Sequence, residues 1–144
     1  MKPKNFLVVD DDCEDTELFV EAVGSVDAEV NCLNAVHGRE ALDKLNGHTI
    51  QLPDIIFLDI NMPVMNGWQF LTEIKESNDL RQIPIIMYST SSNRSDVKNA
   101  ISAGALCFFT KPDDYLRLKK ILQIVVSYMD NNDLSRVCEA IQKA

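Results

Sequence analysis

The chain has 144 residues, and its 22 Asp and Glu residues outnumber its 14 Lys and Arg residues, which gives a formal net charge of −8 at pH 7. This acidic balance argues against a protein that binds nucleic acid, because binding to phosphates requires clustered Lys and Arg side chains. The length is near the commonest domain size, and a hydrophobic content of 46% is sufficient for one core between a sheet and helices on both of its faces.

Apolar residues follow one another without alternation in five short runs, as they do in buried parallel strands. We predict strands at residues 6–9, 30–33, 55–58, 83–88 and 105–109. Apolar residues spaced three and four apart indicate a helix after each strand. We expect the first helix to end at Gly24, the second near Gly47 and the fourth at Gly104, and a long fifth helix to cover residues 118–129. The polar segment 89–95 is expected to be a loop.

This (βα)5 pattern predicts an α/β fold. Right-handed crossovers with helices on both faces favour a doubly wound parallel sheet of five strands in flavodoxin-like order. The chain then continues beyond what this fold needs. Residues 130–133 indicate a break followed by a helix cap, and a short extra helix follows with its apolar face at Leu134, Val137, Cys138 and Ile141. We therefore divide the chain into a domain at 1–130 and a C-terminal helical extension at 131–144.

The cysteines and the N-terminus bear on location. Cys13, Cys32, Cys107 and Cys138 form no C-x-x-C or zinc-type spacing, so we interpret them as small apolar residues in a reducing compartment. Only four apolar residues follow the first five, which is too few for a signal peptide, and no apolar run approaches membrane-spanning length. We expect a soluble, cytoplasmic protein with no membrane partner.

Charged residues stand where three of the predicted strands end. Asp10 and Asp11 follow the first strand, Asp59 follows the third, and Lys111 follows the fifth. The carboxyl edge is where ligands bind in an open α/β sheet. Carboxylates crowded there repel one another and raise each other's pKa, unless a hard cation with oxygen ligands neutralises them. The sequence therefore predicts a Mg²⁺ site at this edge.

Five motifs in fixed order carry a family resemblance. They are Val8-Val9-Asp10-Asp11, Leu58-Asp59-Ile60-Asn61-Met62-Pro63, Asn66-Gly67, Met87-Tyr88-Ser89-Thr90 and Lys111-Pro112. Over about residues 4–129 the chain resembles the receiver domain of two-component response regulators. Among receivers it is most similar to the stand-alone type associated with phytochromes and related sensor kinases.

The resemblance implies a role for each matching residue. Asp59 would accept the phosphoryl group, because it is the one carboxylate at the end of the central strand. Asp11 would bind Mg²⁺ directly and Asp10 through water, and the backbone carbonyl of Asn61 would complete the protein ligands. Lys111 would contact a phosphoryl oxygen.

The resemblance also implies a switch. Ser89, with Thr90 as its neighbouring candidate, would hydrogen-bond the phosphoryl group, and Phe108 would take the aromatic switch position. The Lys111-Pro112 bond is expected to be cis, as in the family, because X-Pro bonds lose little free energy in the cis form.

Neighbouring residues are expected to play structural parts. We interpret Asp12 as the cap of the first helix rather than a third ligand. Glu14 and Asp15 suit the dipole in that helix's first turn, and neither is assigned to the site. Gly67, with Asn66, is expected to close the loop after Asp59 where a positive φ is needed.

These residues predict a single-domain response regulator that receives a phosphoryl group from a sensor histidine kinase or a histidine phosphotransfer protein. It would not be an enzyme beyond its own phosphorylation and dephosphorylation, and it would signal by changed binding to an unknown target protein. One alternative is a haloacid-dehalogenase-type phosphatase with Asp10 as nucleophile, although Glu14 then stands where that family has Thr or Val. An FMN carrier fits less well, since three aspartates would repel its phosphate. A pseudo-receiver scaffold is the remaining alternative.

The apolar stripes of the last two helices raise the question of assembly. Ile124 and Tyr128 look exposed and widen the stripe of the fifth helix. The final helix is too short to be stable alone and must bury its apolar face. It either folds back on its own domain or joins the fifth helix in a two-fold homodimer.

Overall fold

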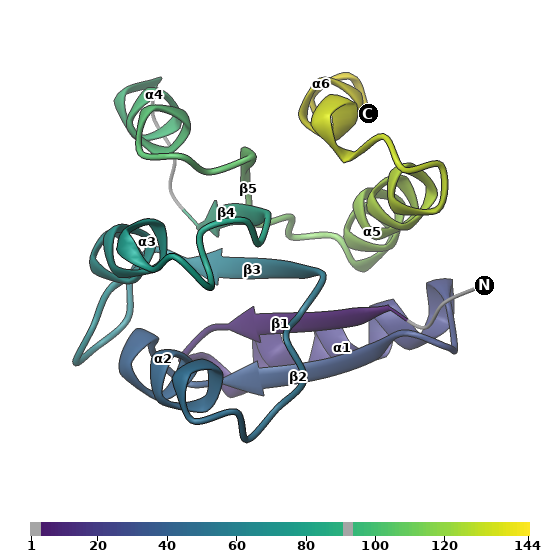
Figure 1. Ribbon diagram of the computed structural model, residues 1–144. Coiled ribbons are helices and arrows are strands. Elements are labelled where there is room, and N and C mark those ends of the chain that lie inside the picture. The colour runs from purple at the N-terminus through teal and green to yellow at the C-terminus, as the bar shows by residue number, and fades with distance from the viewer. Residues whose placement is uncertain (1–3, 91–93) are drawn as a thin grey trace.

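The computed structural model describes residues 4–90 and 94–144. Five strands form one parallel sheet in the order β2-β1-β3-β4-β5, as Figure 1 shows. They are β1 (Asn5–Val9), β2 (Asn31–Ala35), β3 (Ile55–Asp59), β4 (Ile85–Ser89) and β5 (Cys107–Thr110). This order confirms the predicted doubly wound sheet, and it places β3 at the centre with its carboxyl end beside those of β1 and β4.

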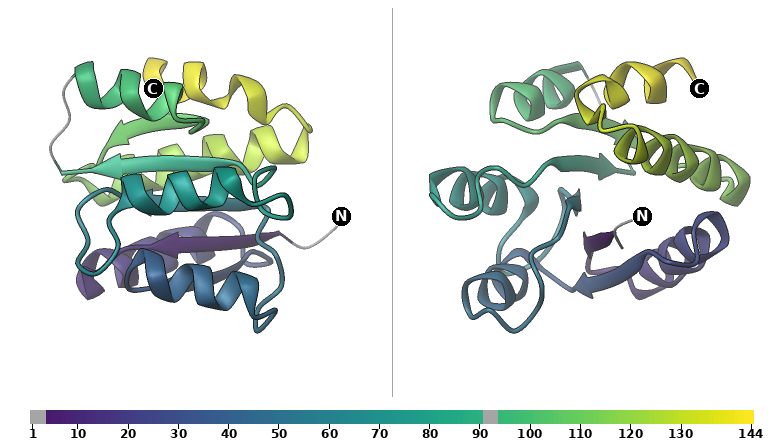
Figure 2. Two further views of the ribbon diagram at one scale, coloured as in Figure 1. Left: turned by 60° about the vertical axis from the view of Figure 1, so that its left-hand side comes forward. Right: turned by 45° about the vertical axis from the view of Figure 1, so that its right-hand side comes forward.

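Helices cover both faces of the sheet (Figure 2). They are α1 (Cys13–Val26), α2 (Gly38–Asn46), α3 (Gly67–Glu76), α4 (Arg94–Ser102), α5 (Tyr115–Asp130), the short 3-10 helix η1 (Leu134–Arg136) and α6 (Val137–Lys143). Residues of α2, α3 and α4 share one apolar cluster with the sheet, and residues of α1, α5 and α6 share the other. None of the helices in the two described ranges combines the length and apolar content needed to span a bilayer.

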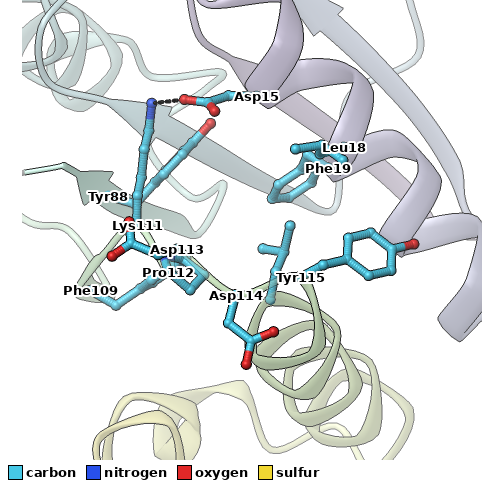
Figure 3. A pocket seen from close by; sticks show the side chains of 11 residues that line it. Asp15, Leu18, Phe19, Tyr88, Phe109, Lys111, Pro112, Asp113, Asp114 and Tyr115 are labelled. Carbon is cyan, nitrogen blue, oxygen red and sulfur yellow. Dashed lines mark hydrogen bonds and ion pairs between the residues drawn. The ribbon is translucent and has the colours of Figure 1, made fainter.

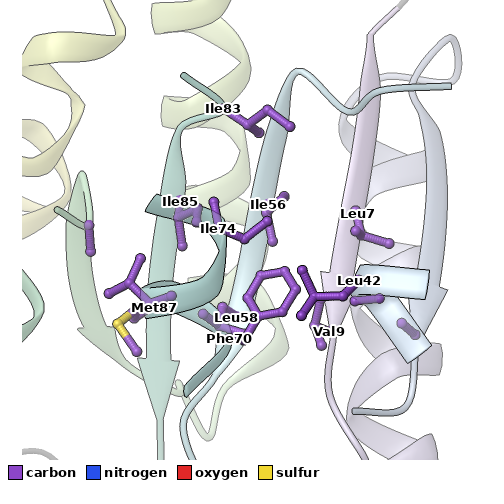
Figure 4. Packing of buried hydrophobic residues seen from close by; sticks show 14 of the residues in the cluster. Leu7, Val9, Leu42, Ile56, Leu58, Phe70, Ile74, Ile83, Ile85 and Met87 are labelled. Carbon is purple, nitrogen blue, oxygen red and sulfur yellow. The ribbon is translucent and has the colours of Figure 1, made fainter. Parts of the chain in front are cut away.

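The core lies in these two clusters, one on each face. Strands β3 and β4 are buried at every position, which explains why their apolar residues do not alternate. On the α2–α3–α4 face, residues of β1, β3 and β4 pack around Phe70 and Ile74 of α3, as Figure 4 shows. On the opposite face, Phe19 of α1 packs edge-on against Phe57 of β3, with ring centroids 4.8 Å apart. The sheet is therefore packed on both faces, and this packing fixes the position of its carboxyl edge.

Several predicted boundaries were wrong, including the starts of β4 and β5, which each begin two residues later than predicted. Helix α1 does not end at Gly24 but continues to Val26, and Asp27 caps it through a backbone hydrogen bond to Val23. A glycine inside a helix costs only about 1 kcal/mol, and burial of Val23 outweighs this cost. Strand β2 begins one residue later and ends two residues later than the predicted run at 30–33. The predicted loop at 89–95 is shorter, since Ser89 belongs to β4 and α4 begins at Arg94; residues 91–93 of that loop lie outside the described residues.

The C-terminal extension packs on its own domain. The predicted break after Asp130 is present, and Asp133 occupies the cap position of η1, but its side chain makes no capping hydrogen bond. In α6, Val137 and Ile141 are fully buried in the cluster shared with α5. Ile124 and Tyr128 are half-buried against the same cluster, so the prediction that they are exposed was wrong. The apolar stripe that includes Ile124 and Tyr128 is therefore partly buried within the chain, because η1 and α6 pack against it.

Candidate functional site

Three charged side chains converge where β1, β3 and β5 end. Asp10 comes directly after β1, Asp59 is the last residue of β3, and Lys111 comes directly after β5. Their side chains are only 0%, 7% and 11% exposed, respectively. Side chains alternate between the faces of a strand, so Asp10 and Asp59 point to the same face as Val8 and Phe57, two residues earlier. The sheet thus holds two carboxylates and one ammonium group together in a largely buried position.

The acidic cluster has the composition of a site for a hard cation. One carboxylate oxygen from each of Asp10, Asp11 and Asp59 lies within 4.8 Å of the others. Asp10 and Asp59 are buried and Asp11 is exposed, so the cluster opens to solvent on the side of Asp11. Three carboxylates and no nitrogen or sulfur donor suit Mg²⁺, Mn²⁺ or Ca²⁺ rather than a softer metal. The donor set therefore fits the predicted ion.

Asp12 takes the structural role that was predicted for it. Its Oδ1 accepts a hydrogen bond of 3.0 Å from the backbone N–H of Asp15 and so caps α1. Its own backbone N–H donates to Oδ1 of Asp10 at 3.0 Å. Asp12 thus contributes a cap and helps to orient Asp10, and it is not one of the three clustered carboxylates.

Lys111 is held by three carboxylates at once. Its Nζ lies 2.9 Å from Asp10 Oδ2, 3.0 Å from Asp15 Oδ2 and 3.6 Å from Asp59 Oδ2. Burial acts to lower the pKa of Lys111, but the hydrogen bonds to Asp10 and Asp15 outweigh it and the pKa is raised. Figure 3 shows the contact between Lys111 and Asp15. Asp15 was not assigned to the site on sequence grounds, but the first turn of α1 brings its carboxylate to the lysine.

Tyr88 is a second site residue that the sequence prediction missed. It lies on β4 opposite Asp59 in register, and its hydroxyl donates a hydrogen bond of 2.8 Å to Asp10 Oδ2. Lys111 Nζ lies 4.9 Å from the centroid of the Tyr88 ring (Figure 3). Burial, followed by the negative charge of Asp10, raises the pKa of Tyr88 well above its usual value, so the phenol remains a donor. A polar residue next to Ser89 in an apolar strand was the available signal.

Asp59 is the carboxylate whose ionisation is most perturbed. Burial, with a smaller contribution from Asp10, raises its pKa to about 7. The charge of Lys111 and a hydrogen bond from the backbone N–H of Asn61 act in the opposite direction. A divalent cation would favour the charged form of Asp59, because its positive charge would offset the negative charge of the two carboxylates. The carbonyl of Asn61 as a ligand stays a prediction.

The loop from β3 to α3 brings its backbone close to Asp59. A Cβ atom on Gly67 would lie 2.5 Å from the carbonyl oxygen of Asp59, so only glycine fits. The predicted reason for Gly67, a positive φ, was wrong: the positive φ of this loop, 67°, belongs to Val64. Asn66 instead caps α3 and forms a capping box with Gln69. The glycine is needed for close approach rather than for a left-handed turn.

The predicted switch residues lie at the ends of β4 and in β5. Ser89 is buried and follows Tyr88, and its carbonyl oxygen accepts a hydrogen bond of 2.8 Å from the backbone N–H of Lys111. Phe108 is 1% exposed and packs in the cluster with Met87 on the α2–α3–α4 face. The aromatic ring is therefore already directed inward. The roles of Ser89 and Phe108 as a switch remain predictions.

The Lys111-Pro112 bond is trans, so the predicted cis bond was wrong; the described residues contain no cis peptide bond. The prediction required cis to aim the lysine inward. In the structure Lys111 Nζ reaches Asp10 and Asp15 from a trans backbone, and trans is the form of lower free energy by about 0.5–1 kcal/mol.

A small apolar cavity adjoins the lysine. It has a volume of about 120 Å³ and lies between α1 and the segment that joins β5 to α5. Figure 3 shows Leu18 and Phe19 of α1 on one side and Pro112 and Tyr115 on the other. Asp15 and Lys111 form its polar end. Apolar side chains thus border Lys111 and Asp15 at the side of the carboxylate cluster.

A doubly wound parallel sheet with clustered carboxylates and a lysine at its carboxyl edge defines a receiver-type protein. Residues 6–123 match the response regulator receiver domain. This match spans most of the chain, and the chain therefore belongs to the receiver domain family of response regulators. Response regulator Rcp1 from Synechocystis sp. is 31% identical over 130 residues, which cover 88% of each chain.

Solved structures agree with this assignment. The phosphorylated cyanobacterial phytochrome response regulator RcpA superimposes with a TM-score of 0.83 at 27% identity, covering 91% of this chain and 96% of that one. The Mn²⁺-bound form of Rcp1 superimposes with a TM-score of 0.78 at 29% identity, covering 88% and 94%. The predicted fold, and the predicted similarity to stand-alone regulators associated with phytochromes, are confirmed.

Proposed function

We propose that the chain is a single-domain response regulator that takes a phosphoryl group onto Asp59 from the phosphohistidine of a sensor histidine kinase or a histidine phosphotransfer protein. The proposal depends mainly on one observation: Asp59 lies in the carboxylate cluster at the end of the central strand, 3.6 Å from Lys111. The domain would span residues 1–130, with 131–144 as an extension. It would catalyse nothing beyond its own phosphorylation and dephosphorylation.

The hydrogen bonds of the two buried acids favour Asp59 over Asp10 as the nucleophile. Oδ2 of Asp10 accepts from Tyr88 and Lys111, and its Oδ1 accepts from the backbone of Asp12. A carboxylate with both oxygens engaged in this way is a poor nucleophile. Asp59 is more weakly held by Lys111, since the separation of 3.6 Å is longer than a charge-assisted hydrogen bond. This difference supports the receiver over the phosphatase.

Transfer would join a carboxylate oxygen of Asp59 to phosphorus and break the bond between phosphorus and the donor's imidazole nitrogen, which keeps the electron pair and takes up a proton. Asp10, Asp11, Asp59 and the backbone carbonyl of Asn61 would hold Mg²⁺, which supplies positive charge against the carboxylates and the phosphoryl oxygens. Lys111 would leave Asp15 and pair with a phosphoryl oxygen. The Mn²⁺-bound form of Rcp1 supports a divalent ion here.

Incubation with acetyl phosphate and Mg²⁺ tests the chemistry. Intact-protein mass spectrometry should show one added phosphoryl group, and both EDTA and Asp59→Asn should abolish it. Asp12→Asn is a suitable control, because Asp12 lies beside the site but outside the carboxylate cluster. Labelling that persists in Asp59→Asn and disappears in Asp10→Asn would establish the phosphatase alternative. A wild-type chain that never becomes labelled would indicate a scaffold without phosphorylation.

The surface beside the cavity supports docking of the phosphodonor protein. Leu18 of α1 lines the cavity and is 46% exposed, and Leu118 of α5 lines it as well. Apolar side chains that reach solvent beside a reactive group favour a protein contact. The donor histidine would then be delivered to Asp59 from the α1 and α5 side of the sheet.

Leu18→Asp separates docking from chemistry. It should slow transfer from the cognate kinase, found by profiling the organism's kinases, and leave labelling by acetyl phosphate unchanged. Leu52→Asp is a matched control, since Leu52 is 49% exposed but lies before β3, at the opposite edge of the sheet. Equal loss of kinase transfer in both variants, or none in either, would refute docking at this surface.

The output would be altered binding of a target protein at the surface of α4, β5 and α5. Ser89 and Phe108 would couple that surface to Asp59. Because Phe108 already packs inward, the coupling requires either a different rotamer or a shift of β5 on phosphorylation. Crystal structures with and without beryllofluoride would decide, and an unchanged Phe108 and β5 in both would exclude this route.

We propose no nucleic-acid partner. For assembly, a homodimer through α5 and α6 is still one arrangement, and the alternative is that α6 folds back on its own domain. The burial of Val137 and Ile141 within one chain favours this alternative. Light scattering of the full chain and of a chain that ends at residue 130 would decide. A monomer in both cases would eliminate the dimer.

A further inference from the structure

Helix α6 covers the outer edge of β5, the last strand of the sheet (Figures 1 and 2). The side-chain amide of Gln142 donates a hydrogen bond of 3.1 Å to the carbonyl oxygen of Phe108. The sulfur of Cys107 lies 3.8 Å from the same oxygen. An edge strand has backbone groups that no neighbouring strand can satisfy, so α6 supplies side-chain partners to β5.

This arrangement brings two cysteines together. Cys138 precedes Gln142 by one helical turn, and so it lies on the same face of α6 and is directed at the same part of β5. Cys107 is buried in the cluster against which Cys138 packs, and both residues lie beside the carbonyl of Phe108, Cys107 directly and Cys138 through the turn that it shares with Gln142. Cys107 is fully buried and Cys138 is half-buried. Both are free thiols.

The two thiols differ in reactivity. The neighbouring thiol of Cys107, helped by polar groups of Phe108 and Gln142, lowers the pKa of Cys138 below that of an ordinary cysteine, although burial opposes this. Interaction with Cys138, followed by burial, raises the pKa of Cys107. Cys138 also lines a groove of about 520 Å³ between α4 and α6, so a small oxidant can reach it. A thiolate that solvent can reach beside a second thiol is the arrangement of redox-sensitive cysteines.

We propose that Cys138 is a peroxide-reactive cysteine, that Cys107 is its resolving partner, and that the disulfide they form fastens α6 to β5. Cys107 and Cys138 are 31 positions apart in the sequence, and no local pattern predicts that they meet, because the contact depends on the docking of α6. A seven-residue helix is marginal alone and is held by packing. The disulfide would make its attachment covalent, next to Phe108.

The chemistry needs only a hydroperoxide. The sulfur of Cys138 attacks one peroxide oxygen, the O–O bond breaks, and the other oxygen leaves as water, so that Cys138 becomes a sulfenic acid. The sulfur of Cys107 then attacks the sulfur of Cys138, the S–O bond breaks, and the oxygen leaves as a second water with the proton of Cys107. Two thiols are oxidised by two electrons in total while one hydrogen peroxide is reduced to two waters.

Peptide mapping of the full chain tests this proposal. Reduced protein is treated with hydrogen peroxide near neutral pH, quenched with an alkylating agent, digested without reductant and analysed by mass spectrometry. We expect a disulfide between Cys107 and Cys138 within one monomer, reversible by dithiothreitol. We also expect amide hydrogen exchange of α6 to slow at least tenfold on oxidation. Prior oxidation of Cys13, an intermolecular disulfide, or overoxidised Cys138 without a disulfide would overturn the proposal.

Variants identify the role of each thiol. Cys138→Ser should abolish the disulfide, whereas Cys13→Ser, which removes an exposed thiol on α1, should leave it intact. Cys107→Ala should leave a sulfenic acid on Cys138 that dimedone traps. If Cys107→Ala does not fold because that site is buried, the pair of Cys138→Ser and Cys13→Ser still decides: equal behaviour of the two would refute the assignment. No phosphodonor is present, so the result is independent of the proposed phosphorylation.

Discussion

The two edges of the sheet differ in how the charges of their lysine and carboxylate side chains are balanced. At the amino edge, Lys4 stands before β1 with Asp27 at 3.3 Å and Asp130 at 2.6 Å, and these acids end α1 and α5. The hydrogen bond to Asp130 leads the effects that raise the pKa of Lys4, although burial opposes them. At the carboxyl edge Lys111 faces Asp10, Asp15 and Asp59, and Asp11 adds a further charge.

This difference separates a structural charge cluster from a functional one. At the amino edge the two acids are partly exposed and share one lysine, so solvent and the ion pairs satisfy all three groups. At the carboxyl edge Asp10 and Asp59 are buried together, and the pKa of Asp59 is raised to about 7 by that burial. Lys111 alone does not balance the acids at this edge, and excess negative charge in a buried position favours binding of a cation. The acids at the amino edge are satisfied by the lysine and solvent, whereas those at the carboxyl edge are not.

The largest expected effect is loss of metal affinity at the carboxyl edge. Asp11→Ala should weaken Mg²⁺ or Mn²⁺ binding by on the order of a hundredfold, because it removes an exposed member of the three-carboxylate cluster. Asp12→Ala, next to it, should change the affinity little and instead lower stability by about 1 kcal/mol through loss of the α1 cap. Isothermal titration with the metal alone measures both. Equal losses of affinity would show that Asp12 is a ligand.

The next effect concerns stability without metal. The native state raises the pKa of Asp59 above that of the unfolded chain, so it binds a proton more tightly between about pH 4 and pH 7. The free energy of unfolding of the metal-free protein should therefore fall as the pH rises through this window. Asp59→Asn should remove this dependence and stabilise the metal-free protein at pH 8 by on the order of 2 kcal/mol. Urea denaturation at several pH values checks it; a metal-free protein with no such slope would contradict the raised pKa.

The amino edge should respond to neither metal nor mild acid. Lys4→Met should destabilise the protein by about 1 kcal/mol, a modest loss because both acids keep access to water. A lysine whose pKa is raised in the folded state contributes fully below its unfolded value of about 10.4 and loses its contribution as pH rises beyond. The loss on mutation should thus be constant between pH 5 and 9. A Mg²⁺ affinity that changes in Lys4→Met would show that the two edges are coupled.

The smallest effect concerns backbone strain. Val64 has a φ of 67°, which is costly for a β-branched residue, and its side chain is 76% exposed, so little packing depends on it. Val64→Gly should stabilise the protein by about 0.5 kcal/mol, since relief of strain exceeds the added entropy of the unfolded chain. Asn132, beyond α5, has a φ of 54°, which asparagine tolerates, so Asn132→Gly should change stability less. Thermal melts compare the two, and a destabilised Val64→Gly would show that the valine side chain is needed in the loop.

Local sequence was sufficient for the approximate positions of the strands and for the central acids. Apolar runs that end at Asp10, Asp59 and Lys111 determine both where the strands lie and which groups face the carboxyl edge, because a parallel sheet collects strand ends at one side. The capping role of Asp12 was also predictable, since a cap depends on residues three positions apart. Helix ends were less reliable: burial of Val23 decided the end of α1, and Gly24 did not.

Only the tertiary structure decided the contacts that join distant segments. Tyr88 reaches Asp10 across 78 positions of sequence, and Lys111 reaches Asp15 across 96. No local pattern contains such a pair, because it depends on how α1 packs over the strand ends and on the register of β4 against β3. The docking of α6 on β5, and with it the meeting of Cys107 and Cys138, follows from an apolar face that could equally have been buried against a second chain.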